Sequence, residues 1–172
     1  NLEETYVGGS LSGPLTIYYD NGQKKTYGIK EGRYYNGLYT SWYENGQKKS
    51  DVKFKDGERD GLHATWFENG KKSFKGNFKD GERDGLHTTW FENGKKKIEV
   101  NTSNNNYDGS YTEWNENGRK VLEGTYVENK KNGLFTFYNE DEKIEKEITY
   151  QNGKVYEEFM FTYHSNGERK SR

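Results

Sequence analysis

The sequence KDGERDGLHATWFENGKK at residues 55–72 returns at residues 79–96 with a single difference, Ala64 against Thr88. The two copies begin 24 residues apart. A repeat of this length corresponds to one supersecondary unit, which can bury its apolar side only against its neighbours. The sequence therefore predicts an array of stacked units.

Each unit is predicted to be one β-hairpin. Residues 62–67 and 73–78 both alternate apolar with polar side chains, as half-buried strands do. Between them lies Glu68-Asn69-Gly70, and Asn and Gly tolerate the positive φ that a tight turn requires.

Two turn geometries would pair these strands differently. A two-residue Asn-Gly turn pairs Thr65 with Phe74, whereas a three-residue Glu-Asn-Gly loop with a bulged Gly pairs Ala64 with Phe74. We predict the three-residue loop, because it gathers the apolar residues on one face and a one-residue slip would reverse every side chain. That face would hold Leu62, Ala64, Trp66, Phe74, Gly76 and Phe78.

The glycine that opens each first strand sets the boundaries of the units. It recurs at Gly13, Gly37, Gly61, Gly85, Gly109 and Gly133, and Glu158 takes its place in a last unit. A half unit at residues 1–12 precedes them, and no stretch has a sustained helical period. We therefore predict one domain over residues 1–172: an all-β, single-layer, twisted antiparallel β-meander of stacked β-hairpins with about fourteen strands.

Composition narrows the choice of partners. Hydrophobic residues make up only 28% of the chain and charged residues 32%, so the 15 Tyr, 9 Phe and 4 Trp must supply the packing. A formal net charge of −1 gives no general attraction to nucleic acid or anionic lipid, and no apolar run is long enough for membrane insertion. The chain begins at Asn1 without Met, which is compatible with signal-peptide removal, so we prefer a secreted or cell-envelope location to a cytoplasmic one.

The recurring pattern Gly-x(4)-Trp/Tyr-Phe/Tyr-Glu-Asn-Gly-Lys, followed by a spacer with Asp-Gly, resembles the bacterial variant of the MORN repeat. The resemblance covers nearly the whole chain. It implies a single-layer sheet of stacked hairpins that serves as an interaction or scaffolding surface. It also implies an antitoxin-like role as an alternative, because some bacterial members carry that label.

Aromatic side chains recur at fixed positions of the unit. One position, five residues after the opening glycine, would form a ladder along the sheet, which serves either as the core or as a binding strip. Its members are Tyr18, Trp42, Trp66, Trp90, Trp114, Tyr138 and Tyr163. The positions facing the opposite side vary more, as expected of a recognition surface or of cross-strand aromatic pairing. They hold Tyr39, Tyr43, His63, Phe67, His87, Phe91 and Tyr111.

Catalytic and metal chemistry are not indicated. His63 and His87 lie one unit apart, too far to share a metal ion. The sequence contains no catalytic triad order and no phosphate-binding loop, so we expect no cofactor and no enzymatic activity. We predict a scaffold that binds a peptide or protein through a concave aromatic face. The alternatives are a carbohydrate-binding or cell-wall-binding module and an antitoxin that neutralises a cognate toxin.

The last strand is predicted to be an association edge. Phe159, Phe161 and Tyr163 alternate onto one face, and an open meander leaves the backbone groups of its terminal strand unpaired. We therefore predict a homodimer formed by antiparallel pairing of this edge with its own copy.

Overall fold

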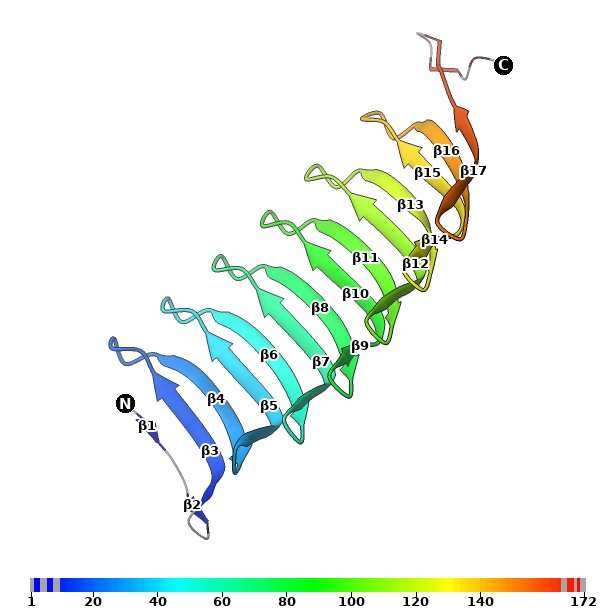
Figure 1. Ribbon diagram of the computed structural model, residues 1–172. Coiled ribbons are helices and arrows are strands. Elements are labelled where there is room, and N and C mark those ends of the chain that lie inside the picture. Colours follow the sequence, from blue (N-terminus) through cyan, green and yellow to red (C-terminus); the bar gives the residue numbers. More distant parts are fainter. Residues whose placement is uncertain (1, 4–5, 8–9, 165–166, 169, 171–172) are drawn as a thin grey trace.

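The computed structural model describes residues 2–3, 6–7, 10–164, 167–168 and 170. All regular structure in these residues is β-strand, and the hairpins stack side by side from one end of the molecule to the other (Figure 1). The strand segments are β1 (Leu2–Glu3), β2 (Tyr6–Val7), β3 (Ser10–Tyr18), β4 (Lys24–Glu31), β5 (Tyr34–Trp42), β6 (Lys48–Lys55), β7 (Glu58–Trp66), β8 (Lys72–Lys79), β9 (Glu82–Arg83), β10 (Gly85–Trp90), β11 (Lys96–Ser103), β12 (Asn106–Trp114), β13 (Lys120–Val127), β14 (Lys130–Lys131), β15 (Gly133–Tyr138), β16 (Ile144–Gln151) and β17 (Lys154–Met160).

These segments form one antiparallel sheet in which each strand pairs with its neighbours in the chain. Three pairs of segments are halves of an interrupted strand, because β1 and β2 both pair with β3, β9 and β10 both pair with β8, and β14 and β15 both pair with β13. The seventeen described segments therefore correspond to fourteen strands. The predicted single-layer all-β meander is confirmed.

The predicted three-residue loop is present between the strands of each hairpin. The Phe67 N–H donates to the Lys71 carbonyl at 2.8 Å, and the Gly70 N–H donates to the Phe67 carbonyl at 2.9 Å. Gly70 has φ 79°, as a bulged glycine after a turn requires. Glu68, Asn69 and Gly70 thus form the loop.

The strand register predicted from this loop is wrong, because a second bulge follows it. Trp66 pairs with Lys72, but Thr65 pairs with Phe74, so the strand register skips Ser73, whose hydroxyl lies 2.6 Å from that of Thr65. One extra residue reverses the faces of all later side chains. The same shift leaves out one residue in the other hairpins, namely Lys25, Lys49, Lys97, Val121 and Glu145.

The two faces of the sheet consequently differ from the predicted ones. Leu62, Ala64 and Trp66 lie on one side, which we call the tryptophan face. Phe74, Gly76 and Phe78 lie on the other side with His63, which pairs with Gly76, and we call this side the aromatic face. The prediction of a single apolar face that holds both sets is therefore incorrect.

The core is a central row of side chains that crosses the aromatic face from strand to strand. The row alternates a large residue of each first strand with a glycine or β-branched residue of each second strand. It comprises Leu15, Gly28, Tyr39, Val52, His63, Gly76, His87, Val100, Tyr111, Gly124, Phe135 and Ile148. Its most buried member, Phe135, is 0% exposed.

Glycines in the central row make room for aromatic rings of the next hairpin. A Cβ on Gly76 would lie 2.5 Å from Nδ1 of His87, and a Cβ on Gly124 would lie 2.5 Å from Cδ1 of Phe135. Real side chains do not approach so closely, so the rings pack directly on the glycine backbone. The rings therefore join successive units.

The aromatic face lies on the inside of a bend. The rings of Tyr35 and Tyr39 have centroids 4.8 Å apart. Four residues of a straight strand would separate them by about 13 Å. Gly37 lies between them with φ 80°, and the first strands curve visibly in Figure 1. This curvature allows side chains to be buried in a single layer.

The fit between Gly124 and Phe135 provides a test of this packing. Gly124→Ala is expected to lower the free energy of unfolding in urea by about 1–3 kcal/mol, the usual cost of overfilling a packed site. The control is Thr125→Ala, an exposed position on the same strand, with an expected change within about 0.5 kcal/mol. Equal stability of the two variants would contradict the packing described for the central row.

Candidate functional site: the tryptophan face

A ladder of alternating aromatic and cationic side chains crosses the tryptophan face. Each tryptophan pairs across its own hairpin with a lysine, as Trp66 pairs with Lys72. That lysine then lies over the ring of the next unit. The distances from Nζ to the ring centroid are 5.3 Å for Lys48 and Trp66, 5.5 Å for Lys72 and Trp90, 5.4 Å for Lys96 and Trp114, and 5.7 Å for Lys120 and Tyr138. These cation–π contacts make the ladder continuous.

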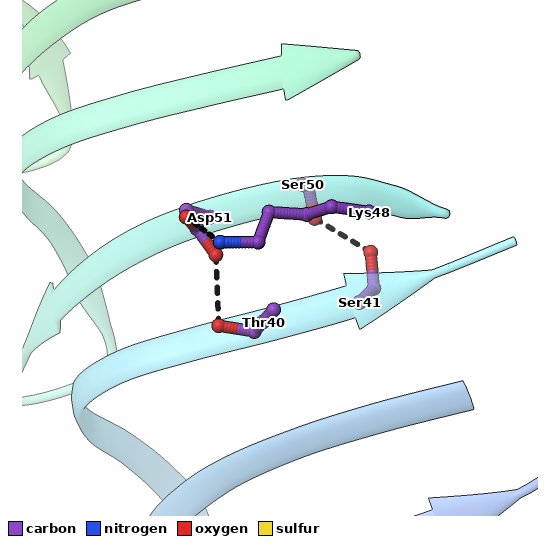
Figure 2. Close-up of polar contacts among 5 residues, drawn as sticks. All are labelled: Thr40, Ser41, Lys48, Ser50 and Asp51. Carbon is purple, nitrogen blue, oxygen red and sulfur yellow. Dashed lines mark hydrogen bonds and ion pairs between the residues drawn. The ribbon is translucent and has the colours of Figure 1, made fainter. Parts of the chain in front are cut away.

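Most lysines of this ladder are neutralised by an acid three residues later. Figure 2 shows the arrangement in the hairpin of β5 and β6, where Lys48 Nζ lies 2.8 Å from Asp51 and Thr40 donates to the same carboxylate at 2.8 Å. On the other face of this hairpin the hydroxyls of Ser41 and Ser50 are 2.7 Å apart. The ladder is thus held by fixed polar contacts as well as by its rings.

The same arrangement recurs in later hairpins. Lys96 lies 2.6 Å from Glu99, and Lys120 lies 2.7 Å from Glu123. Hydrogen bonds from Lys120 and Tyr138 lower the pKa of the Glu123 carboxyl. The acid therefore stays ionised and the pair stays neutral overall.

Exposed leucines accompany the ladder, and the sequence analysis, which placed Leu62 on the apolar face, named none of them as a candidate site residue. They follow the opening glycine of four units: Leu38 is 53% exposed, Leu62 45%, Leu86 47% and Leu134 50%. Alternation places each of them on the tryptophan face. The repeated Gly-Leu pair in the sequence would have revealed them, because no covering layer was expected. Together with the ladder they form an uncovered surface with apolar and charged parts.

The residues predicted to face the opposite side fall into two groups. Tyr39, His63, His87 and Tyr111 belong to the central row, and the last two are only 4% and 8% exposed. Each ring contacts another aromatic ring, within its own unit for Tyr39, His63 and Tyr111 and across to the preceding unit for His87.

The second group lies at the ends of the hairpins and comprises Tyr43, Phe67 and Phe91. The Tyr43 hydroxyl donates to the Trp66 carbonyl at 2.8 Å, which links one unit to the next. Phe67 and Phe91 take the same position and open their loops. The structure therefore separates this group from the Trp ladder by face.

His63 and His87 are core residues that lie on either side of Gly76. Both rings contact Phe74 and Phe78, with centroid distances between 5.3 and 5.5 Å. Nε2 of His87 lies 2.8 Å from the Asn77 carbonyl, whereas Nδ1 of each ring has no hydrogen-bond partner among the described residues. Burial, together with the charges of Arg59 and Arg83, lowers the pKa of His63 to about 4, and burial also lowers the pKa of His87.

The described part of the chain holds no cluster of three or more His, Cys, Asp or Glu suited to a metal ion. Nor does it form a helix long and apolar enough to cross a membrane.

The C-terminal edge differs from the predicted one. β17 ends at Met160, and Phe161 and Tyr163 lie beyond it. The Phe161 N–H donates to the Glu145 carbonyl at 2.8 Å, and the Tyr163 hydroxyl donates to the Ile144 carbonyl at 2.7 Å. The predicted edge residues Phe159, Phe161 and Tyr163 are therefore half-buried, and Tyr156 is the most exposed ring of the edge at 74%. Self-association through this edge stays a prediction.

Comparison with known families identifies the repeat. The family model of the MORN repeat variant matches residues 35–56, 59–80, 83–104 and 131–152, which amount to 88 of the 172 residues. Each match runs from a first strand through the three-residue loop to the end of the second strand. No curated protein matches the chain.

The buried histidines predict a pH dependence of stability. In the unfolded chain His63 binds a proton near pH 6.5, whereas in the folded protein it does so near pH 4. Between these values the unfolded state binds more protons, so the free energy of unfolding should fall as the pH drops from 6.5 towards 4. After allowance for partial solvent exposure, the expected loss is on the order of 2 kcal/mol, measured by urea unfolding at about pH 7 and about pH 4.5.

The neighbouring units supply the control for this measurement. Tyr111 and Phe135 occupy equivalent places in the central row, so the variant with His63→Tyr and His87→Phe should fold. Its stability should change less over the same pH range, since no histidine ring is buried. An unchanged acid-dependent loss in this variant would show that other groups cause it.

Proposed function

Because the chain belongs to the MORN repeat variant family, whose members are repeat scaffolds and generally non-enzymatic, we propose that its tryptophan face binds an extended segment of a protein partner. The observation that supports this proposal is the ladder of half-buried tryptophans beside exposed leucines on a face without a covering layer. Large aromatic residues and uncovered apolar side chains are typical of the centres of protein interfaces.

The spacing of the ladder suits an extended chain. Successive tryptophans are two strands apart, or about 10 Å, which is the length of about three residues of an extended segment. A partner segment laid across the hairpins would place a side chain near each rung. The number of rungs in contact would then set the affinity.

The lysines of the ladder favour a peptide over a carbohydrate. Sugar rings stack on an open aromatic face, but Lys48, Lys72 and Lys96 each lie over the ring of a tryptophan. A peptide can use the ring edges, the lysine ammonium groups and the leucines together. The face therefore has the chemistry of a protein interface more than that of a sugar site.

Intrinsic fluorescence tests the proposal directly, since all four tryptophans of the chain belong to the ladder. We expect peptides selected from a displayed random library on the wild-type protein to shift the tryptophan emission. Their affinity should fall by about tenfold or more for Trp90→Ala, as for an interface hot spot. Isothermal titration calorimetry with the same peptides gives the dissociation constants.

Two further variants make this result interpretable. Leu62→Ser removes an exposed side chain of the same face with little effect on folding and should also weaken binding. Tyr156→Ala changes an exposed ring on β17, outside the ladder, and should leave binding unchanged. Peptides that bind Trp90→Ala and Leu62→Ser as tightly as the wild type would refute the proposal.

A further inference from the structure

One hairpin breaks the charge pattern of the tryptophan face. The third residue after the ladder lysine is an acid in the other units that carry this lysine between β5 and β13, namely Asp51, Glu99 and Glu123. After Lys72 the same position holds Lys75. Among the described residues no acid lies within ion-pair distance of either lysine, so the hairpin of β7 and β8 carries two positive charges where its neighbours carry a neutral pair.

The residue across the hairpin changes together with this charge. Thr40 pairs with Asp51 and donates to its carboxylate at 2.8 Å (Figure 2). Thr88 likewise pairs with Glu99, and its hydroxyl donates to the Glu99 carboxylate at 3.4 Å.

Lys75 has no acceptor for a threonine hydroxyl, and the residue paired with it is Ala64. The two duplicated stretches differ only at this position, which holds Ala64 in one and Thr88 in the other. The difference therefore accompanies the replacement of the acid across the hairpin, Glu99, by Lys75.

The two lysines line a hollow between the third and fourth units. It has a volume of about 380 Å³, and its walls include Lys72, Lys75, Leu86, Thr88, Trp90 and Lys96. The only acid in its wall, Glu99, is already paired with Lys96 at 2.6 Å. Lys72 is fixed over the Trp90 ring at 5.5 Å, and Leu86 is 47% exposed. The hollow thus combines two uncompensated cations with the apolar side chains of Leu86 and Trp90.

We propose that this hollow binds the carboxylate of an acidic residue in the partner segment, flanked by apolar residues; the inference rests on the function proposed above. Lys75 lies beside Thr88, midway along the strand between Leu86 and Trp90. Alternate residues of a strand are about 6.6 Å apart. An extended segment with an apolar residue two positions before and two positions after the acid therefore matches the hollow, and the lysines donate charge-assisted hydrogen bonds to the carboxylate.

The charge distribution favours a peptide over a lipid surface. A membrane attracts proteins through several basic residues spread over one face. Here the two unpaired lysines lie between Asp51 and Glu99 of the adjacent units, and the whole chain has a formal net charge of −1. One carboxylate can enter the hollow beside Lys72 and Lys75, because Glu99 in its wall is already paired with Lys96.

The probe is the acetylated, amidated peptide Ser-Leu-Ser-Glu-Ser-Leu-Ser, and its matched partner has Gln in place of Glu. We expect the Glu peptide to bind the wild-type protein about tenfold more tightly than the Gln peptide at low salt, with a smaller preference at high salt. Tryptophan fluorescence and calorimetry measure both. Binding of vesicles of phosphatidylcholine and phosphatidylserine that depends on Lys75 and exceeds peptide binding would overturn the proposal.

The protein offers its own control variants. Ala64→Thr with Lys75→Glu rebuilds the pattern of the adjacent units, so it should fold normally and lose the preference for Glu over Gln. Thr112→Ala with Glu123→Lys copies the third unit into the fifth and should raise the stoichiometry of the Glu peptide from one to two.

The outcomes separate this inference from the proposed function. If library-selected peptides require Trp90 but the Glu and Gln peptides bind equally, or the variant with Ala64→Thr and Lys75→Glu keeps its preference, only the carboxylate site is refuted. If neither designed peptide binds while selected peptides do, the carboxylate site is again refuted. If no selected peptide responds to Trp90→Ala and Leu62→Ser, the proposed function fails as well.

Discussion

In each hairpin from β3 to β16, the strand register skips one residue at the start of the second strand, as it skips Ser73 between Lys72 and Phe74. This second bulge follows a loop that already contains a bulged glycine. Because strand side chains alternate, the extra residue moves Phe74, Gly76 and their equivalents to the face opposite the tryptophans. The separation of a packed face from an open one depends on that residue.

The packed face, which is the aromatic face, provides the core of a sheet that has no second layer. Glycines alternate with Val or Ile along the second strands of the central row, and two of these glycines receive rings from both sides. Gly76 lies between His63 and His87, and Gly124 lies between Tyr111 and Phe135. The contacts of a ring thus cross from one hairpin to the next, which is why a unit is stable only within the array. Buried neutral histidines are tolerated here because their rings serve as aromatic packing.

The open face is free to differ from unit to unit. Its ladder of tryptophan and lysine repeats with little change, while the position three residues after the lysine switches from acid to Lys75 in one hairpin. A repeat scaffold can acquire specificity in this way, because one substitution on an uncovered face alters local charge without disturbing the core. The accompanying Ala64 removes a hydroxyl that has lost its acceptor.

The sequence by itself determined the period of 24 residues, the hairpin in each unit, the Glu-Asn-Gly loop and the single-layer antiparallel meander, because these follow from local turn chemistry and from alternation within one strand. It also identified the aromatic positions of the candidate site. Only the tertiary structure decided which of them share a face. The bulge at Ser73 has no signal in the local sequence, yet it shifts the strand register by one residue and so exchanges the faces of the side chains that follow. The burial of His87 and the exposure of Leu86 follow from that pairing within the hairpin, from the curvature of the sheet and from the contacts between units.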